Sequence, residues 1–276
     1  MYKIIALDMD GTLLDHKKQI SDEDRRALKA ATEAGVHIVM ASGRCSPTLW
    51  EFAEALELHP DNFHIISLNG AVVFDGYGNK LRDVRMEREL SDYIIEKIAS
   101  LGLIYVAYYE TDALLAKLPS YDAASTSAIE NYYAVSKAKI TLSDNMIKDL
   151  PKDVYKILII GEHNNLRDLE AWMKENAAHM DYAMFLTTTV YLEFTSTASD
   201  KAAALELICD RLSLDIRTES IAIGDGHNDI SMIKAAAVGA CMANGAKDVK
   251  ACADYITEKT NRESGVAEVV WRFALA

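Results

Sequence analysis

Short apolar runs that end in polar loops alternate with longer amphipathic stretches along this chain. This alternation predicts the strands and helices of an α/β protein with a parallel sheet. Residues 3–8 predict a buried strand, and residues 22–34 predict a helix that follows a Ser21 cap and ends at Gly35. A strand at residues 36–41, a helix from Pro47 toward Leu58 and a strand at residues 64–68 complete a βαβαβ pattern.

The chain changes character near residue 84, after a cluster of turn-forming residues at 75–80. The following segment predicts an α+β insert that begins with a helix carrying Leu90, Ile94, Ile98 and Leu101 on one face. Its expected strands lie near residues 103–109, 113–118, 155–160, 182–186 and 190–195, and its second helix near 163–178. Residues 120–150 fit no single element. Alternating helices and strands then resume. Helices are expected at residues 200–212 and 229–236, and strands at residues 220–224 and 238–242. We therefore expect a discontinuous core domain of residues 1–83 and 194–276 around an inserted domain of residues 84–193.

The composition and net charge limit the kinds of molecule that this protein is expected to bind. Half of the 276 residues are hydrophobic (50%), which predicts a folded globular protein. A formal net charge of -13 gives no electrostatic footprint for nucleic acid or an anionic membrane. A small phosphorylated molecule is compatible with this charge, because a bound metal can reverse the field inside one cleft. With neither a signal peptide nor an apolar run of membrane-spanning length, a soluble cytoplasmic protein is expected.

Four polar clusters lie where apolar strands are predicted to end. They are residues 8–12, 42–44, 69–70 and 224–229, with the sequences DMDGT, SGR, NG and GDGHND. Ligands of parallel sheets bind at the carboxyl ends of the strands, near the point where the strand order reverses. We therefore expect one cleft to collect all four clusters.

The aspartates of these clusters predict a magnesium site. Asp8, Asp225 and Asp229 would repel one another without a counter-charge, and Mg²⁺ prefers carboxylate oxygens and waters. Asp8 and Asp225 are the best side-chain ligands, and the backbone carbonyl of Asp10 is a plausible third. Two interpretations of Asp229 remain open: it ligates the metal directly, or it orients waters and Lys201.

The same residues predict a covalent mechanism. Once a cation and nearby donors neutralise a phosphoryl group, the Asp8 carboxylate can attack phosphorus. Asp10, two residues further on, can protonate the leaving oxygen and later take a proton from water. The candidate phosphate-binding residues are Thr12, Ser42, Gly43, Lys201 and Asn228.

Taken together, five short segments of the chain resemble the motifs of a known family. The segments DMDGTLL (8–14), ASGR (41–44), NGA (69–71), SDK (199–201) and GDGHND (224–229) are similar to those of the haloacid dehalogenase superfamily. More narrowly they resemble its Cof-like phosphatases, which carry a large α/β cap between the second and third motifs. The resemblance spans nearly the whole chain. It implies a Rossmann-like doubly wound core, Mg²⁺, an Asp8 nucleophile, an Asp10 acid/base, and metal contacts from Asp8, Asp10 and Asp225. Ala202 and Ala243 depart from the family pattern, where glycine is usual.

Four residues are candidates for contact with the rest of the substrate: Arg44, Asn69, His227 and Asn244. Each also has an ordinary structural interpretation, as a turn former, a surface ion pair or an exposed loop residue.

The sequence predicts a phosphatase acting on a small phosphorylated metabolite, with sugar phosphates and phosphorylated cofactor precursors as the classes that the resemblance implies. One alternative is a phosphomutase or phosphotransferase that passes the phosphoryl group to another hydroxyl. Another is a non-catalytic sensor of phosphometabolites, since a fold alone does not prove activity. The second carboxylate, Asp10, speaks against the sensor, because binding alone needs no proton transfer.

Overall fold

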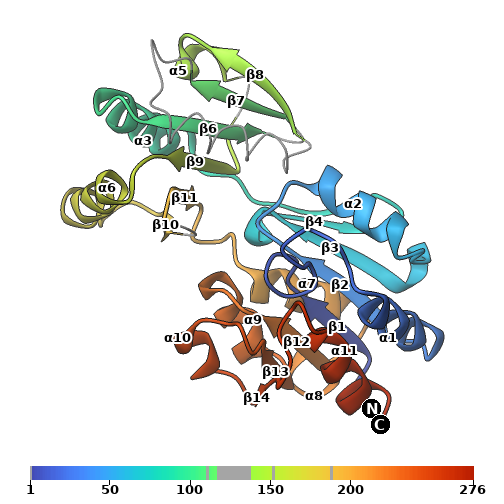
Figure 1. The fold of residues 1–276 in the computed structure, drawn as a ribbon. Helices are drawn as coiled ribbons and strands as arrows, with labels where there is room; N and C mark the ends of the chain where they lie inside the picture. Colours follow the sequence, from blue (N-terminus) through green and yellow to red (C-terminus); the bar gives the residue numbers. More distant parts are fainter. Residues whose placement is uncertain (1, 110–111, 117–137, 151–152, 187–188) are drawn as a thin grey trace. The chain divides into compact units, whose positions relative to one another are not determined.

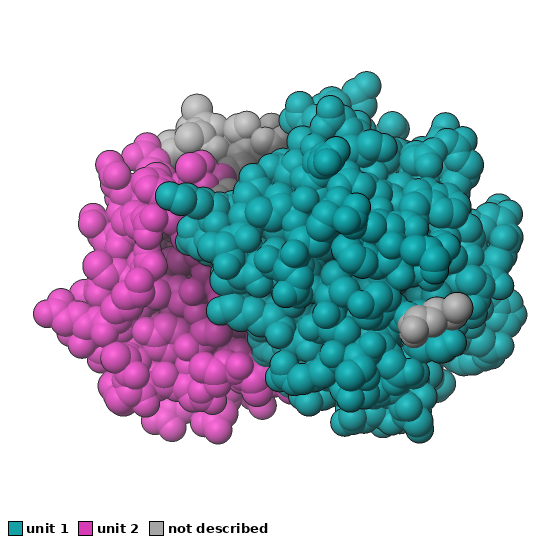
Figure 2. Space-filling view, turned by 90° about the horizontal axis from the view of Figure 1, so that it is seen from below, with its two compact units in different colours: residues 1–83, 200–276 teal, residues 84–199 magenta. Residues whose placement is uncertain are grey.

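A computed structural model describes residues 2–109, 112–116, 138–150, 153–186 and 189–276 of the chain. The chain forms two compact units, one of residues Met1–Asp83 with Asp200–Ala276 and the other of residues Val84–Ser199 (Figure 2). Each unit has its own sheet and its own hydrophobic clusters. None of the helices in the described ranges is long and apolar enough to cross a bilayer.

The first unit is built on an eight-stranded sheet of order β14-β13-β12-β1-β2-β3-β4-β5 (Figure 1). Its strands are β1 (Ile4–Leu7), β2 (His37–Ala41), β3 (Phe63–Ser67), β4 (Val72–Asp75), β5 (Lys80–Asp83), β12 (Ser220–Gly224), β13 (Val238–Cys241) and β14 (Tyr255–Ile256). The strands from β14 to β3 are parallel, and β4 and β5 add an antiparallel hairpin at one edge. The chain steps outward from β1 to β3 and returns to the other side of β1 at β12. The strand order therefore reverses at β1, where α/β sheets bind ligands.

Helices cover both faces of this sheet, as a doubly wound fold requires. They are α1 (Asp22–Glu33), α2 (Ser46–Ala55), α7 (Lys201–Arg211), α8 (Ile216–Glu219), α9 (Ile230–Ala235), α10 (Lys247–Lys250) and α11 (Gly265–Val269). Short helical turns are η1 (Pro60–Asn62), η2 (Leu68–Gly70), η3 (His227–Asp229) and η4 (Val270–Ala274). Alternate residues of β1 face opposite ways. Ile5 and Leu7 pack with α1, α2 and α11, whereas Ile4 and Ala6 pack with α7 and α9.

The second unit, which we call the insert, has a six-stranded sheet of order β10-β11-β9-β6-β7-β8. Its strands are β6 (Ile104–Tyr109), β7 (Asp112–Ala116), β8 (Lys139–Ser143), β9 (Lys156–Ile160), β10 (Ala183–Leu186) and β11 (Tyr191–Thr195), and its helices are α3 (Arg88–Ser100), α5 (Met146–Asp149) and α6 (His163–Asn176). The long helices α3 and α6 pack on one face of the sheet. The other face carries a separate apolar cluster and a buried ion pair, Lys156 Nζ to Glu193 Oε1 at 3.1 Å.

The predicted fold class, a Rossmann-like α/β core with an inserted α+β domain, is confirmed by this architecture. Strand β8 and helix α5 lie in the stretch of residues 120–150 for which the sequence predicted no single element, and residues 120–137 of that stretch lie outside the described residues. Strand β11 continues to Thr195 and the insert ends at Ser199, whereas the sequence places the boundary after residue 193. The reason is that Thr195 still pairs with Lys156 in the insert's sheet.

Candidate active site

Three carboxylates from two strand ends meet in the first unit. Asp8 follows β1, Asp225 follows the neighbouring strand β12, and Asp229 ends the turn η3. One oxygen from each lies within 4.8 Å of the others. Asp8 and Asp229 are buried, with exposed fractions of 6% and 0%. These residues therefore form an acidic cluster in the position where the strand order reverses.

Gly11 allows the loop after β1 and the loop after β12 to approach each other. Its φ of +87° lies in the left-handed region, and a Cβ there would lie only 2.3 Å from Asp225 Oδ2. A side chain at this position would therefore separate the two carboxylate-bearing loops.

Lys201 is the cation inside the cluster. As the first residue of α7 it is 1% exposed, and its Nζ lies 2.6 Å from Asp8 Oδ1 and 2.6 Å from Asp229 Oδ1. It also donates to the Ala41 carbonyl at the end of β2, at 2.9 Å. Burial disfavours the charged amine, but Asp229 and then Asp8 outweigh that effect, so the pKa of Lys201 is raised. The side chain is a fixed positive charge that joins three strand ends.

One lysine does not neutralise the cluster. Burial, followed by repulsion from Asp229, raises the pKa of Asp8 well above its ordinary value, although Lys201 opposes the shift. Burial, again followed by Asp229, raises the pKa of Asp225 to about 6, although the Thr12 hydroxyl donates to Asp225 Oδ1 at 2.9 Å. Carboxylates that resist ionisation in this way are stabilised by a further cation, so the donor set fits a hard divalent metal.

Asp229 is already engaged through both of its oxygens. Oδ1 accepts from Lys201, and Oδ2 accepts from the backbone N–H groups of Asp225 and Gly226, at 3.0 and 2.9 Å. These bonds shape the loop that carries Asp225.

Asp10 forms ion pairs with two cations, Arg44 and Lys18. Arg44 donates from Nε to Asp10 Oδ2 at 2.6 Å and from Nη2 to Asp10 Oδ1 at 2.7 Å, while Lys18 Nζ lies 2.6 Å from the same Oδ1. Burial alone would raise the pKa of Asp10, but Arg44 and then Lys18 lower it to about 2. In this conformation Asp10 is therefore held as a carboxylate. The sequence analysis missed Lys18, because a lysine in a polar turn gives no local signal of its partner.

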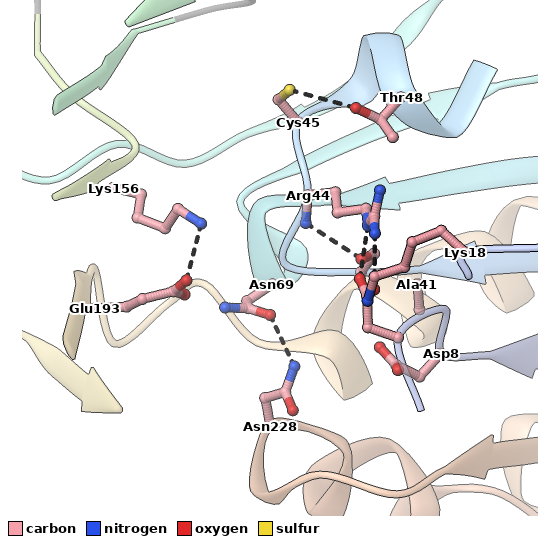
Figure 3. A network of polar contacts seen from close by, with 12 residues as sticks. Asp8, Lys18, Ala41, Arg44, Cys45, Thr48, Asn69, Lys156, Glu193 and Asn228 are labelled. Carbon is pink, nitrogen blue, oxygen red and sulfur yellow. Dashed lines mark hydrogen bonds and ion pairs between the residues drawn. The ribbon is translucent and has the colours of Figure 1, made fainter. Parts of the chain in front are cut away.

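The loops after β2 and β3 form another wall of the site. The Ser42 hydroxyl accepts from the backbone N–H of Arg44 at 3.2 Å, and a Cβ on Gly43 would lie 3.0 Å from Asn69 Oδ1. Asn69 is 3% exposed, and its Oδ1 accepts from Asn228 Nδ2 at 3.0 Å. Figure 3 shows these two amides pointing toward each other. The structure therefore brings two further predicted clusters together through an amide pair.

The remaining candidates have other partners. Asn244 donates to the Gly11 carbonyl at 2.7 Å and accepts from the backbone N–H of Asn261 at 2.9 Å, so it connects the loop after β1 to the segment around Asn261. The imidazole of His227 is mostly exposed and lies 3.0 Å from Asp248 Oδ2. These interactions of Asn244 and His227 do not involve the carboxylates of the acidic cluster.

Comparisons with known proteins agree with this architecture. A model of the haloacid dehalogenase-like hydrolases matches residues 5–270. Phosphatase YwpJ of Bacillus subtilis is 30% identical over 97% of this chain and 98% of its own. The 5-amino-6-(5-phospho-D-ribitylamino)uracil phosphatase YcsE of Bacillus subtilis is 29% identical over 99% of this chain and 96% of its own. A haloacid dehalogenase-like hydrolase from Bacteroides thetaiotaomicron superposes with a TM-score of 0.86 at 31% identity, covering 99% of both chains.

The chain belongs to the haloacid dehalogenase-like hydrolases. The predicted Cof-like subfamily, and with it the enzyme class of phosphoric monoester hydrolase, are confirmed.

Proposed function

We propose that this enzyme is a Mg²⁺-dependent phosphatase that removes the phosphoryl group of a small metabolite through an aspartyl-phosphate on Asp8. The observation that carries the proposal is the acidic cluster itself: a buried carboxylate beside Lys201, with Asp10 two residues away in the same loop. Such an arrangement suits a nucleophile that needs charge neutralisation and a separate group for proton transfer.

The metal would be held by the Asp8 and Asp225 side chains and the Asp10 backbone carbonyl. We assign Asp229 to orienting the loop and Lys201, because both of its oxygens already accept hydrogen bonds there. When bound, Mg²⁺ neutralises charge on the phosphoryl oxygens and so lowers the repulsion between them and Asp8.

Two displacements at phosphorus follow from the roles of Asp8 and Asp10. In the first, an Asp8 oxygen bonds to phosphorus while the bond to the leaving oxygen breaks, and that oxygen takes a proton from Asp10. In the second, water attacks the same phosphorus, gives a proton to Asp10, and releases Asp8 as a carboxylate. Arg44 and Lys18 favour the ionised Asp10 that the second step needs. The first step requires Asp10 to leave these donors in its protonated form.

Phosphate oxygens would be held by Ser42, the Gly43 backbone and Asn228. Lys201 would join them by exchanging one of its three present acceptors for a phosphate oxygen. Thr12 is buried and its hydroxyl donates to Asp225, so we assign it to orienting that carboxylate within the phosphate site. Preorganised donors of this kind stabilise charge that develops in the transition state.

The substrate class is inferred from the relatives, among which YcsE is named for its action on a phosphorylated ribitylamino-uracil. A sugar phosphate or a phosphorylated cofactor precursor has comparable chemistry. We assign the choice among such molecules to the insert, which corresponds to the cap of the Cof-like phosphatases.

Phosphate release from a panel of phosphorylated metabolites, with and without Mg²⁺, tests the proposal. We expect turnover of at least one sugar phosphate or cofactor precursor, abolished by EDTA, and acid quenching should trap phosphoryl on Asp8 as detected by peptide mass spectrometry. A phosphoryl group that reappears on another hydroxyl would instead identify a phosphotransferase. Tight binding without turnover would identify a sensor.

Metal binding should weaken as the pH falls. In the metal-free protein Asp225 has a pKa of about 6, so protons compete with the metal below that pH. From this group alone, the apparent affinity for Mg²⁺ at pH 5.5 should be roughly four-fold below that at pH 7.5. The raised pKa means that the folded state binds a proton before the unfolded state does, so acidification from pH 7.5 stabilises the metal-free site.

Thermal unfolding measures both effects. Mg²⁺ should raise Tm clearly at pH 7.5 and much less at pH 5.5. Asp225→Asn should remove both the Mg²⁺-dependent shift and its dependence on pH. Equal shifts at the two pH values would show that Asp225 is not a ligand.

A further inference from the structure

A left-handed turn follows β3 on the wall of the site. Leu68, Asn69 and Gly70 have φ values of 51°, 57° and 97°, so three consecutive residues adopt positive φ. Asparagine and glycine adopt this region readily, but leucine does so at a cost. A strained conformation persists only where its surroundings fix it from several sides, and such strain concentrates at functional sites.

The surroundings of this turn are parts of the proposed phosphate site. The backbone N–H of Leu68 donates to the Arg44 carbonyl and that of Asn69 to the Ser42 carbonyl, each at 3.0 Å. These two bonds dock the turn on the loop that carries Ser42 and Gly43. The backbone of the turn therefore sets the position of that loop relative to β3.

The side chain of Asn69 reaches a second loop. Its Oδ1 accepts from Asn228 Nδ2 at 3.0 Å, across an interval of 159 residues in sequence. This bond occupies one of the two amide hydrogens of Asn228 and orients its side chain, because a planar amide has few orientations that satisfy a fixed partner. The same oxygen of Asn69 lies close to Gly43.

Gly70 connects the turn to α7. A Cβ on Gly70 would lie 2.3 Å from the Asp200 carbonyl oxygen and 2.5 Å from its carbon. Asp200 is the N-cap of α7, where its side chain accepts from the backbone N–H of Ala203, and the next residue is Lys201. The turn is held from its other side by Arg82, whose Nε donates to the Gly70 carbonyl at 3.0 Å. Direct packing thus relates the turn to the helix end that carries Lys201.

We propose that Asn69 is a positioning residue, which acts on the reaction by orienting Asn228 and by fixing the left-handed turn between the loop of Ser42 and the start of α7. This role rests on the proposed function of Asn228 as a phosphate contact. It differs from direct contact with the substrate, because the Asn69 side chain is buried and directed at another protein amide.

A double-mutant cycle on Asn69 and Asn228 tests the coupling. Asn69→Gly removes the amide and keeps a residue that adopts positive φ without strain. Asn228→Ala removes the proposed phosphate contact. If Asn69 acts through Asn228, each single variant should lower kcat/KM by about ten-fold or more, since a hydrogen bond to a charged group carries effects of this order. The double variant should then lie within about three-fold of Asn228→Ala, whereas independent roles would multiply.

Two further readouts separate positioning from general damage. The Mg²⁺-dependent rise of Tm should be unchanged in Asn69→Gly, because Asn69 does not belong to the acidic cluster. The affinity for inorganic phosphate, measured by calorimetry, should fall with the same non-additive pattern as kcat/KM. Asn79→Gly is the matched control: it removes an exposed amide that bonds to Asp75 in the β4–β5 hairpin, and it should leave both quantities as in the wild type.

Multiplicative losses in the double variant, or an unaffected phosphate affinity in Asn69→Gly, would overturn the proposal. If Asn69→Gly does not fold, Asn69→Ser, whose hydroxyl is too short to reach Asn228, replaces it in the same cycle. The phosphate-binding cycle is independent of turnover. A protein that binds phosphate without hydrolysing a substrate would refute the proposed function and still decide the role of Asn69.

Discussion

Asp8→Asn is expected to abolish phosphate release, with a loss of at least about 10³-fold in kcat, because an amide cannot replace the carboxylate that attacks phosphorus. The same substitution should not destabilise the metal-free protein. Asp8 is buried beside Asp229 and Asp225, and its raised pKa shows that the ionised form is disfavoured. A neutral side chain of equal size relieves that repulsion, although it weakens the contact with Lys201.

Phosphate release and thermal unfolding in EDTA measure the two halves of this result. Asp210→Asn, an exposed position on the helix that Lys201 begins, is the matched control and should retain full activity. An Asp8→Asn protein that keeps a tenth of the wild-type rate would show that water attacks the substrate directly. Loss of activity together with a large fall in Tm would show only that Asp8 is structural.

Among the substitutions proposed for this protein, Lys201→Met should lower the free energy of unfolding the most. The lysine Nζ lies 2.6 Å from two buried carboxylates, and methionine fills a similar volume without a charge. Removing one partner of a buried ion pair costs about 3–5 kcal/mol, because the remaining charges stay buried without compensation. Activity should fall at least about 100-fold, since the phosphate oxygens and Asp8 lose the same donor.

A second substitution distinguishes this mechanism from a simple packing defect. In Lys201→Met with Asp229→Asn, one of the two uncompensated carboxylates is neutralised, so Tm should recover in part while activity does not. Denaturant unfolding without Mg²⁺ gives the free energies of both variants. If the double variant is no more stable than Lys201→Met alone, the charge balance inferred for the cluster is wrong.

The position of the acidic cluster could be predicted from the sequence because parallel strands deliver their carboxyl ends to one edge of a sheet. Asp8, Ser42 and Asp225 each follow an apolar run, and the strand order of the family pattern makes β1 the neighbour of both β2 and β12. Lys201 was identified through its surrounding motif, and the structure places it against Asp8 and Asp229. The roles assigned to these residues remain predictions.

The orientation of individual side chains was beyond the reach of the sequence. Lys18 pairs with Asp10 because the loop of residues 15–19 folds back. Neither the charge of Lys18 nor its distance from Asp10 in the sequence predicts that contact. Asn69 is a candidate for contact with the substrate, and the sequence did not predict that its oxygen faces Asn228. Such choices depend on rotamers and tertiary partners, which hydrophobic periodicity does not encode.

The central place of β1 in its sheet has a consequence for how the chain is made. Ile4 of β1 pairs with Ser220 of β12, so the whole segment between these two strands must be synthesised before that edge of β1 is covered. During that time an apolar strand is open to pairing with other chains. Contacts so far apart in sequence also slow folding, because a long loop must close before they form. The insert, whose strands pair among themselves, needs no such delay. The arrangement that assembles Asp8 and Asp225 therefore also leaves one edge of β1 unpaired in the nascent chain until β12 has been synthesised.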